Sequence, residues 1–206
     1  MSNYKTVIFT LGILQIILGI SMVFPIIVQL VFNELDSSFI SASIITIIFG
    51  ILFFLSNLDH DKKLFLPHTF LLTALSWTSI AIFGSLPFIF SNLDLSFTDS
   101  FFEAMSGLTT TGATIFGSNI GQTPEIEELS KGLLFWRSFT QFIGGMGIVL
   151  FAIAILPILG MGGVQLFRAE VAGPAVDKFT PRVKETAKYL CSIYLGLIII
   201  ETIVLY

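Results

Sequence analysis

The sequence is poor in charged residues and contains a single cysteine, and both shortages restrict what the chain can be. Charged residues make up 12% of the 206 positions, against about a quarter in soluble domains. Hydrophobic residues make up 54%, and 22 residues are phenylalanine. This composition indicates an integral membrane protein, and we predict an all-α polytopic fold. Cys191 stands alone, so an internal disulfide framework is excluded.

The sequence also lacks the residue patterns of most catalytic and nucleotide-binding sites. It contains no glycine-rich phosphate loop, nucleophile elbow or HExxH motif. The spacing of His60 and His68 supplies no converging set of metal ligands. No basic patch of the kind that binds nucleic acid is present. We therefore predict that the chain is not an enzyme, carries no organic cofactor and binds no nucleic acid.

Long apolar stretches predict membrane-spanning helices, because about 20 apolar residues cross the hydrocarbon core. These stretches are residues 7–32, 39–55, 70–90, 133–159 and 189–206. The first is too long for a signal peptide, and no small-residue cleavage site follows it. We expect it to remain as a span.

The distribution of lysine and arginine predicts the orientation of the chain, because these residues accumulate on the cytoplasmic side. Basic residues lie between the second and third spans and between the fourth and fifth: Lys62, Lys63, Arg168, Lys178, Arg182, Lys184 and Lys188. The amino terminus is then cytoplasmic. The external loops collect Glu34, Asp36, Asp94, Asp99, Glu125, Glu127 and Glu128. These acids either gather cations through a negative potential or are merely tolerated outside.

A polar stretch, "SGLTTTGAT" at residues 106–114, separates the third and fourth spans. The preceding "FTDSFFEAMSGL" predicts a helix, with Thr98 or Ser100 as N-cap and Asp99 near its positive end. Ser100 and Glu103 have the spacing of a capping box.

This helix is too short to cross a membrane. Residues 98–108 would rise only about 17 Å as an α-helix, whereas the hydrocarbon core is about 30 Å thick. The fourth span must run back to the cytoplasm to place the basic residues after it there. Residues 98–120 are therefore predicted to form a re-entrant loop.

The tip of the predicted loop has the chemistry of an ion filter. Irregular backbone at membrane depth must line a water-filled cavity or be buried in protein. Residues 109–114 offer carbonyl and hydroxyl oxygens that can replace the hydration shell of a cation. Gly112 can adopt a positive φ without penalty, and the helix would direct its negative end to the same place. The alternative is a small-residue turn that packs the loop without contacting an ion.

Arg137 and Gln141 lie four residues apart on one face of the fourth span. Ionisable residues inside membrane spans indicate function by default. Arg137 either pairs with Glu103 and supports the filter, in which case exchanging the two charges should restore filter function, or extends to the outer headgroups. Glu201, in the last span, has no assigned role.

Five stretches, one of which includes residues 106–114, carry a resemblance to a known family. They are "GSLPFIF" at 84–90, "TDSFFEAMSGLTTTGAT" at 98–114, "GGMGIVLFAIAILPILGMGG" at 144–163, "FRAEVAGP" at 167–174 and "PRVKETAK" at 181–188. The resemblance as a whole extends over essentially the whole chain. The sequence resembles the TrkH type of the Trk/Ktr/HKT superfamily of potassium transporters, which carry four non-identical span–pore–span repeats in one chain.

The resemblance implies a division of the chain into four parts. Residues 1–60 would form two amino-terminal transmembrane helices, and residues 61–163 a first repeat with the filter loop at 98–120. Residues 164–188 would form a cytoplasmic amphipathic linker, with a helix from Pro181, that is either a plain connection or a docking site for a regulator. Residues 189–206 would be the first span of a second repeat, so we expect a fragment of a longer transporter.

The resemblance also implies the function. Potassium uptake across the bacterial inner membrane would use Thr110 and Thr111 as coordinating residues and Gly112 as the filter glycine, flanked by Thr109 and Ala113. The implied partners are a cytoplasmic nucleotide-binding ring of the TrkA/KtrA type and a second copy of the full-length transporter. Two alternatives stay open. One is a channel-like subunit that assembles from identical chains. The other is an intramembrane enzyme with a threonine or serine of residues 106–114 as nucleophile, for which the sequence offers no accompanying intramembrane histidine or lysine as base.

Overall fold

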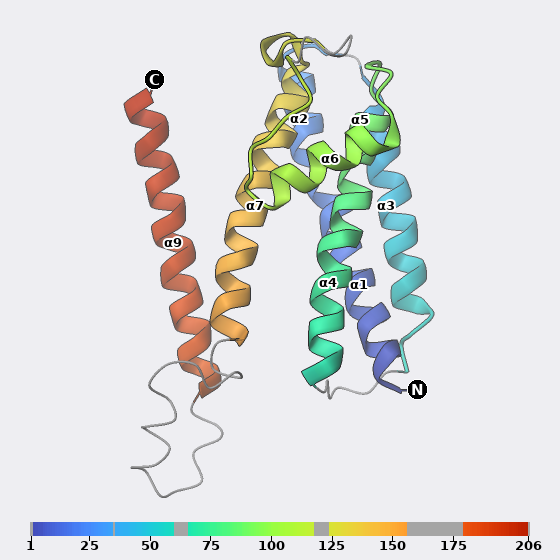
Figure 1. Cartoon of the computed structure of the whole chain (residues 1–206), viewed down its shortest axis with the longest axis vertical. Coiled ribbons are helices and arrows are strands. Elements are labelled where there is room, and N and C mark those ends of the chain that lie inside the picture. The colour runs from blue at the N-terminus through green and yellow to red at the C-terminus, as the bar shows by residue number, and fades with distance from the viewer. Residues whose placement is uncertain (1, 35, 60–65, 118–123, 156–178, 206) are drawn as a thin grey trace, which may run out of the picture. The chain divides into compact units, whose positions relative to one another are not determined.

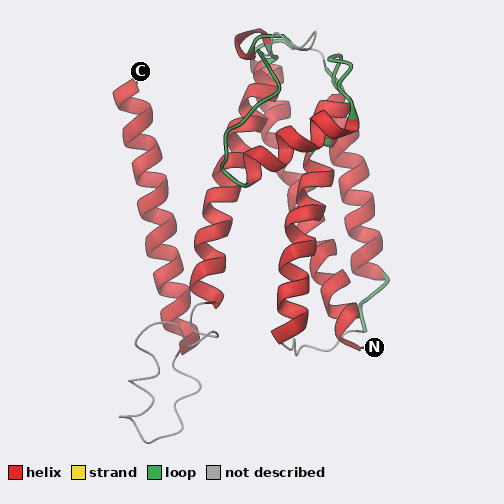
Figure 2. Cartoon of the chain, in the orientation of Figure 1, coloured by secondary structure: helices red, strands yellow, loops and turns green. Residues whose placement is uncertain are grey.

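The computed structural model describes residues 2–34, 36–59, 66–117, 124–155 and 179–205. Every regular element among these residues is a helix, which confirms the predicted all-α fold class (Figure 2). The elements are α1 (Ser2–Ser21), α2 (Val23–Val31), α3 (Ser38–Leu55), α4 (Leu66–Gly84), α5 (Leu86–Ile89), α6 (Phe97–Leu108), η1 (Ile126–Glu128), α7 (Lys131–Ile155) and α9 (Phe179–Leu205).

Three helical stretches of the described residues are long and apolar enough to cross a membrane. They are Tyr4–Val31, Ser38–Leu55 and Pro67–Ile89, which correspond to the first three predicted spans. The fourth and fifth predicted spans fall on α7, of 25 residues, and α9, of 27 residues. Their crossing of the membrane stays a prediction, and residues 156–159 lie outside the described part of the chain.

The predicted linker is only partly described. Residues 164–178 lie outside the described residues. The helix expected to begin at Pro181 begins two residues earlier, at Phe179, and continues to Leu205. The proposed boundary between linker and span at residue 188 therefore falls inside one helix.

Two of the predicted spans are interrupted by a break of one residue, where a single continuous helix was expected. Helix α1 ends at Ser21 and α2 begins at Val23, with Pro25 in its first turn. Helix α4 ends at Gly84 and α5 follows, with Pro87 in its first turn. Proline has no N–H to donate, and its ring clashes with the carbonyl group four residues earlier. The helical hydrogen bonding therefore stops just before each proline.

Small and polar residues hold the first helices together. Helices α1, α3 and α4 lie side by side in Figure 1. A Cβ atom on Gly12 would lie only 2.8 Å from the carbonyl oxygen of Gly50, so the backbones of α1 and α3 approach closely. Gln15 Nε2 donates a hydrogen bond of 2.6 Å to Ser79 Oγ, which joins α1 to α4.

Helix α7 is anchored where α4 breaks. The indole N–H of the fully buried Trp136 donates to the Gly84 carbonyl oxygen at 3.0 Å. This oxygen is free of its helical partner, because the Phe88 N–H donates to Ser85 instead. The break after α4 thus creates the acceptor that positions α7.

The amino-terminal end of α7 is capped from a distant loop. The Glu34 carboxylate accepts hydrogen bonds from the Lys131 N–H at 2.7 Å and the Gly132 N–H at 3.2 Å. A carboxylate at this end of a helix also interacts favourably with the helix dipole. One of the acids expected in the external loops is therefore a structural cap.

The chain divides into two compact units, residues 1–142 and residues 143–206. Helix α9 belongs to the second unit. All residues of the candidate site described below lie in the first.

Candidate ion-binding site

The short helix before the threonine-rich stretch starts earlier than the sequence predicted. Its N-cap is Ser96, whose backbone is extended (φ −66°, ψ 159°) as N-caps require. Ser96 Oγ accepts from the Asp99 N–H at 3.2 Å, and the hydroxyl donates to Asp99 Oδ2 at 2.6 Å. The prediction of Thr98 or Ser100 as N-cap is therefore wrong.

The predicted capping box of Ser100 and Glu103 is wrong as well. Ser100 is fully buried inside α6, and its hydroxyl has no hydrogen-bond partner among the residues that the structure describes. The Glu103 side chain is directed away from the start of the helix and into a separate network.

Helix α6 has the length and course that a re-entrant loop needs. Its 12 residues rise about 18 Å, well short of the hydrocarbon thickness of about 30 Å. Figure 1 shows α6 lying between α4 and α7, after which the chain turns back and runs beside α7. The last residues of the predicted loop, 118–120, lie outside the described residues.

The backbone after α6 turns its N–H groups toward the helix and leaves a row of oxygens free. The N–H groups of residues 109–112 all donate to carbonyl oxygens in the last turn of α6. The carbonyl oxygens of Thr110, Thr111 and Gly112 accept no hydrogen bond from any described residue. All three residues are exposed. Consecutive free carbonyl oxygens are the groups that coordinate a dehydrated cation in a filter.

Two residues of this stretch have left-handed backbone conformations. Thr110 has φ 55° and Gly112 has φ 73°. Glycine adopts this conformation without strain, but for a β-branched threonine it is an outlier. Such strain persists only where the surroundings impose it, and it gathers at functional sites.

The flanking carbonyl groups are already engaged. The Ala113 oxygen accepts from Ser106 Oγ at 2.6 Å, and the Thr109 oxygen accepts from Thr110 Oγ1 at 2.7 Å. Of the five residues predicted to bind an ion, the structure thus separates Thr109 and Ala113 from the three with free oxygens. Sequence reasoning missed Ser106, although this polar residue stands in the last turn of α6.

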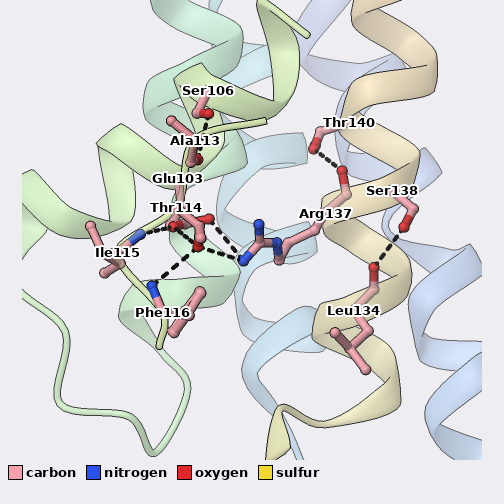
Figure 3. A network of polar contacts seen from close by, with 10 residues as sticks. All are labelled: Glu103, Ser106, Ala113, Thr114, Ile115, Phe116, Leu134, Arg137, Ser138 and Thr140. Atoms are coloured by element: carbon pink, nitrogen blue, oxygen red, sulfur yellow. Dashed lines mark hydrogen bonds and ion pairs between the residues drawn. The ribbon is translucent and has the colours of Figure 1, made fainter. Parts of the chain in front are cut away.

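A buried carboxylate holds the chain segment that follows. The Glu103 side chain is 1% exposed, and its Oε1 accepts from Thr114 Oγ1 and from the Ile115 N–H, both at 2.6 Å (Figure 3). Its Oε2 lies 3.2 Å from Nη1 of Arg137. The predicted pairing of Glu103 with Arg137 is confirmed, while a role of the pair in supporting a filter stays a prediction.

Arg137 contacts the same segment from α7. Its Nη1 donates to Thr114 Oγ1 at 2.8 Å, and its guanidinium lies over the Phe116 ring, 5.3 Å from the ring centre. The side chain is 14% exposed. Arg137 therefore turns inward, and the alternative of an extension to the headgroups is not what the structure shows.

The chemistry of this site is that of neutral oxygen ligands. Residues 109–113 carry no charged side chain. Within the described part of the chain, no group of three or more histidine, cysteine, aspartate or glutamate residues could hold a metal ion. The site can offer backbone oxygens, which suit weakly hydrated monovalent cations, and lacks the carboxylates that divalent cations prefer.

Comparison with known proteins identifies the family. The family model for TrkH, described as a cation transport protein, matches residues 35–206. The Trk system potassium uptake protein TrkH of Vibrio parahaemolyticus is 41% identical over 200 residues, which cover 96% of this chain and 40% of that protein. The Trk system potassium uptake protein TrkI of Halomonas elongata is 37% identical over 197 residues, which cover 95% and 38%.

A solved structure agrees with these relatives. The crystal structure of the potassium transporter TrkH from Vibrio parahaemolyticus matches with a TM-score of 0.77 and 37% identity, over 95% of this chain and 38% of that one.

The chain belongs to the TrkH family of cation transport proteins and is a membrane protein. It spans about two fifths of the length of these relatives, since it covers 40% and 38% of them. The relatives are named as transport proteins, in agreement with the prediction that the chain is not an enzyme.

Proposed function

We propose that the chain takes part in potassium uptake through the bacterial plasma membrane and that the carbonyl oxygens of Thr110, Thr111 and Gly112 coordinate the ion. The observation that carries this proposal is the row of free, exposed carbonyl oxygens at the end of α6. The names of the relatives, which are potassium uptake proteins, support the choice of ion.

One loop supplies only part of a filter, because selective filters are rings of coordinating loops. In this proposal the other loops come from further repeats of a longer polypeptide. The orientation follows the basic residues, with the amino terminus in the cytoplasm. The proposed assembly also contains a cytoplasmic nucleotide-binding ring and a second copy of the transporter. The relatives are named as proteins of a Trk system, which supports an assembly of several components.

The network around Glu103 supports the filter from behind. Glu103 belongs to α6, Thr114 and Ile115 to the returning segment, and Arg137 to α7. A filter must keep its oxygens in place while an ion enters and leaves. Fixing the segment immediately after Gly112 to two helices limits its movement.

Potassium uptake in a bacterium without its own potassium transporters tests the proposal. Two proteins are compared. One is the 206-residue chain. The other, called here the extended chain, is the same chain followed by the part of the Vibrio parahaemolyticus relative that comes after the matched residues. The extended chain should restore growth at low potassium, and the 206 residues alone should not. Growth with the 206 residues alone would overturn the idea of a pathway completed by further repeats.

Replacement of Gly112 tests the site itself. In the extended chain, Gly112→Val should abolish rubidium uptake, because valine cannot adopt the left-handed conformation at φ 73° without strain. The amount of protein in the membrane, measured by immunoblot, shows whether the variant is made. Undiminished rubidium uptake by Gly112→Val would contradict the assignment of the filter.

A further inference from the structure

Gln141 lies one helical turn beyond Arg137, on the side of α7 that faces the threonine-rich segment. Arg137 contacts Thr114 of that segment directly. Gln141 is close to Gly112: a Cβ atom placed on Gly112 would lie 3.9 Å from Gln141 Nε2, its nearest neighbour. Two residues of one helix face thus meet two positions of the segment.

The spacing of these two contacts fits a helix and a chain segment that run in opposite directions. Four residues of α-helix, from Arg137 to Gln141, rise about 6 Å. The two residues from Thr114 back to Gly112 span at most about 7 Å. The two distances are similar. Gln141 therefore lies beside Gly112 in the same way that Arg137 lies beside Thr114.

The Gln141 amide is unused within the described part of the chain. It forms no hydrogen bond with any described residue, although its side chain is half-buried. The neighbouring Thr140 donates to the Arg137 carbonyl oxygen, and Ser138 donates to that of Leu134. A polar amide in an apolar helix is costly unless it finds a partner. The nearest segment with free backbone acceptors contains Gly112.

We propose that Gln141 is a positioning residue of the filter: its amide donates to the free carbonyl oxygen of Gly112 and limits how far this segment can move away from the ion. This inference rests on the proposed function. Gly112 has no side chain of its own to hold it, and glycine can leave its left-handed conformation at little cost. Rotation about the side-chain bonds of Gln141 brings Nε2 to the Gly112 backbone. Loss of the amide then changes the preference among cations and leaves the fold intact.

Cation preference of the extended chain tests the inference. Gln141→Met keeps the length of the side chain and removes the amide. Sodium and rubidium uptake are measured in membrane vesicles that contain equal amounts of transporter. The ratio of rubidium to sodium uptake should fall about fivefold, as expected when one neutral hydrogen bond is lost. Ser138→Ala, which removes a hydroxyl bonded only within α7, should leave the ratio unchanged.

An unchanged ratio in Gln141→Met would overturn the inference. If that variant is missing from the membrane, Gln141→Asn decides, since it keeps an amide that is too short to reach Gly112, and an unchanged ratio there overturns the inference equally. The proposed function is judged separately by Gly112→Val. A loss of uptake in Gly112→Val with no effect of Gln141→Met rejects the role of Gln141 alone.

Discussion

The carboxylate of Glu103 lies 3.2 Å from the guanidinium of Arg137 and is 1% exposed to solvent. The same carboxylate accepts hydrogen bonds from Thr114 and Ile115. One side chain of α6 thereby joins the returning segment and α7. Glu103 is thus the contact point of three segments, and its support of a filter stays a proposal.

Removal of the charge on Glu103 should destabilise the protein strongly. In Glu103→Gln the partly buried guanidinium of Arg137 loses its counter-ion, and breaking a buried ion pair from one side costs up to about 3–5 kcal/mol. Thermal unfolding of the purified extended chain measures the effect. Glu127→Gln, at an exposed position of η1, is the control and should leave the melting temperature unchanged. Equal melting temperatures for both variants would show that the pair contributes little to stability.

Exchange of the two charges should fail to restore uptake. Glu103→Arg combined with Arg137→Glu restores a pair of opposite charges, which from the sequence alone was expected to restore filter function. Arginine has no hydrogen-bond acceptor, so the Thr114 hydroxyl and the Ile115 N–H lose their partner. Rubidium uptake by the double variant should therefore stay as low as in the single variants. Recovered uptake would mean that a pair of opposite charges suffices and that the hydrogen bonds to Thr114 and Ile115 do not matter.

Substitutions at Gly112 should rank by their tolerance of a left-handed backbone. A Cβ atom there would meet nothing closer than 3.9 Å, so the penalty comes from φ 73° and not from a clash. Asparagine tolerates this region better than alanine, and β-branched valine tolerates it least. Rubidium uptake should fall in the order Gly112→Asn, Gly112→Ala, Gly112→Val. Equal effects of all three would show that the backbone conformation is not what the position requires.

Gly107 should be sensitive to substitution for a different reason. A Cβ atom at Gly107 would run into the Thr140 side chain, where α6 packs against α7. Gly107→Ala should therefore reduce the melting temperature, and Thr140→Ala should partly compensate, because the Thr140 Oγ1 atom is then gone. A double-mutant cycle measures the coupling, which for contacting residues amounts to about 0.5–3 kcal/mol. Strictly additive effects would contradict the contact.

The sequence predicted those features that depend on local pattern. Apolar length placed the first three spans, and the positions of Glu103 and Arg137 suggested a pair that the structure contains. The breaks at Met22 and Ser85 were missed, because proline near a span end is ordinary in membrane helices and its effect depends on its place in the turn.

The remaining errors concern contacts between segments. The N-cap Ser96 was missed because Thr98 and Ser100 are equally suitable residue types, and only the backbone conformation decides among them. The free and engaged carbonyl oxygens of residues 109–113 could not be distinguished, because the bond from Ser106 to Ala113 forms only when the chain turns back on α6. The type of a side chain does not determine the direction in which the backbone oxygen of that residue points.

The location of bound rubidium tests the central claim most directly. Anomalous scattering from crystals of the extended chain grown with rubidium in place of potassium would reveal the ion. The account predicts a rubidium peak in contact with the carbonyl oxygens of Thr110, Thr111 and Gly112. A rubidium peak elsewhere along the pathway, with none at these three oxygens, would contradict it.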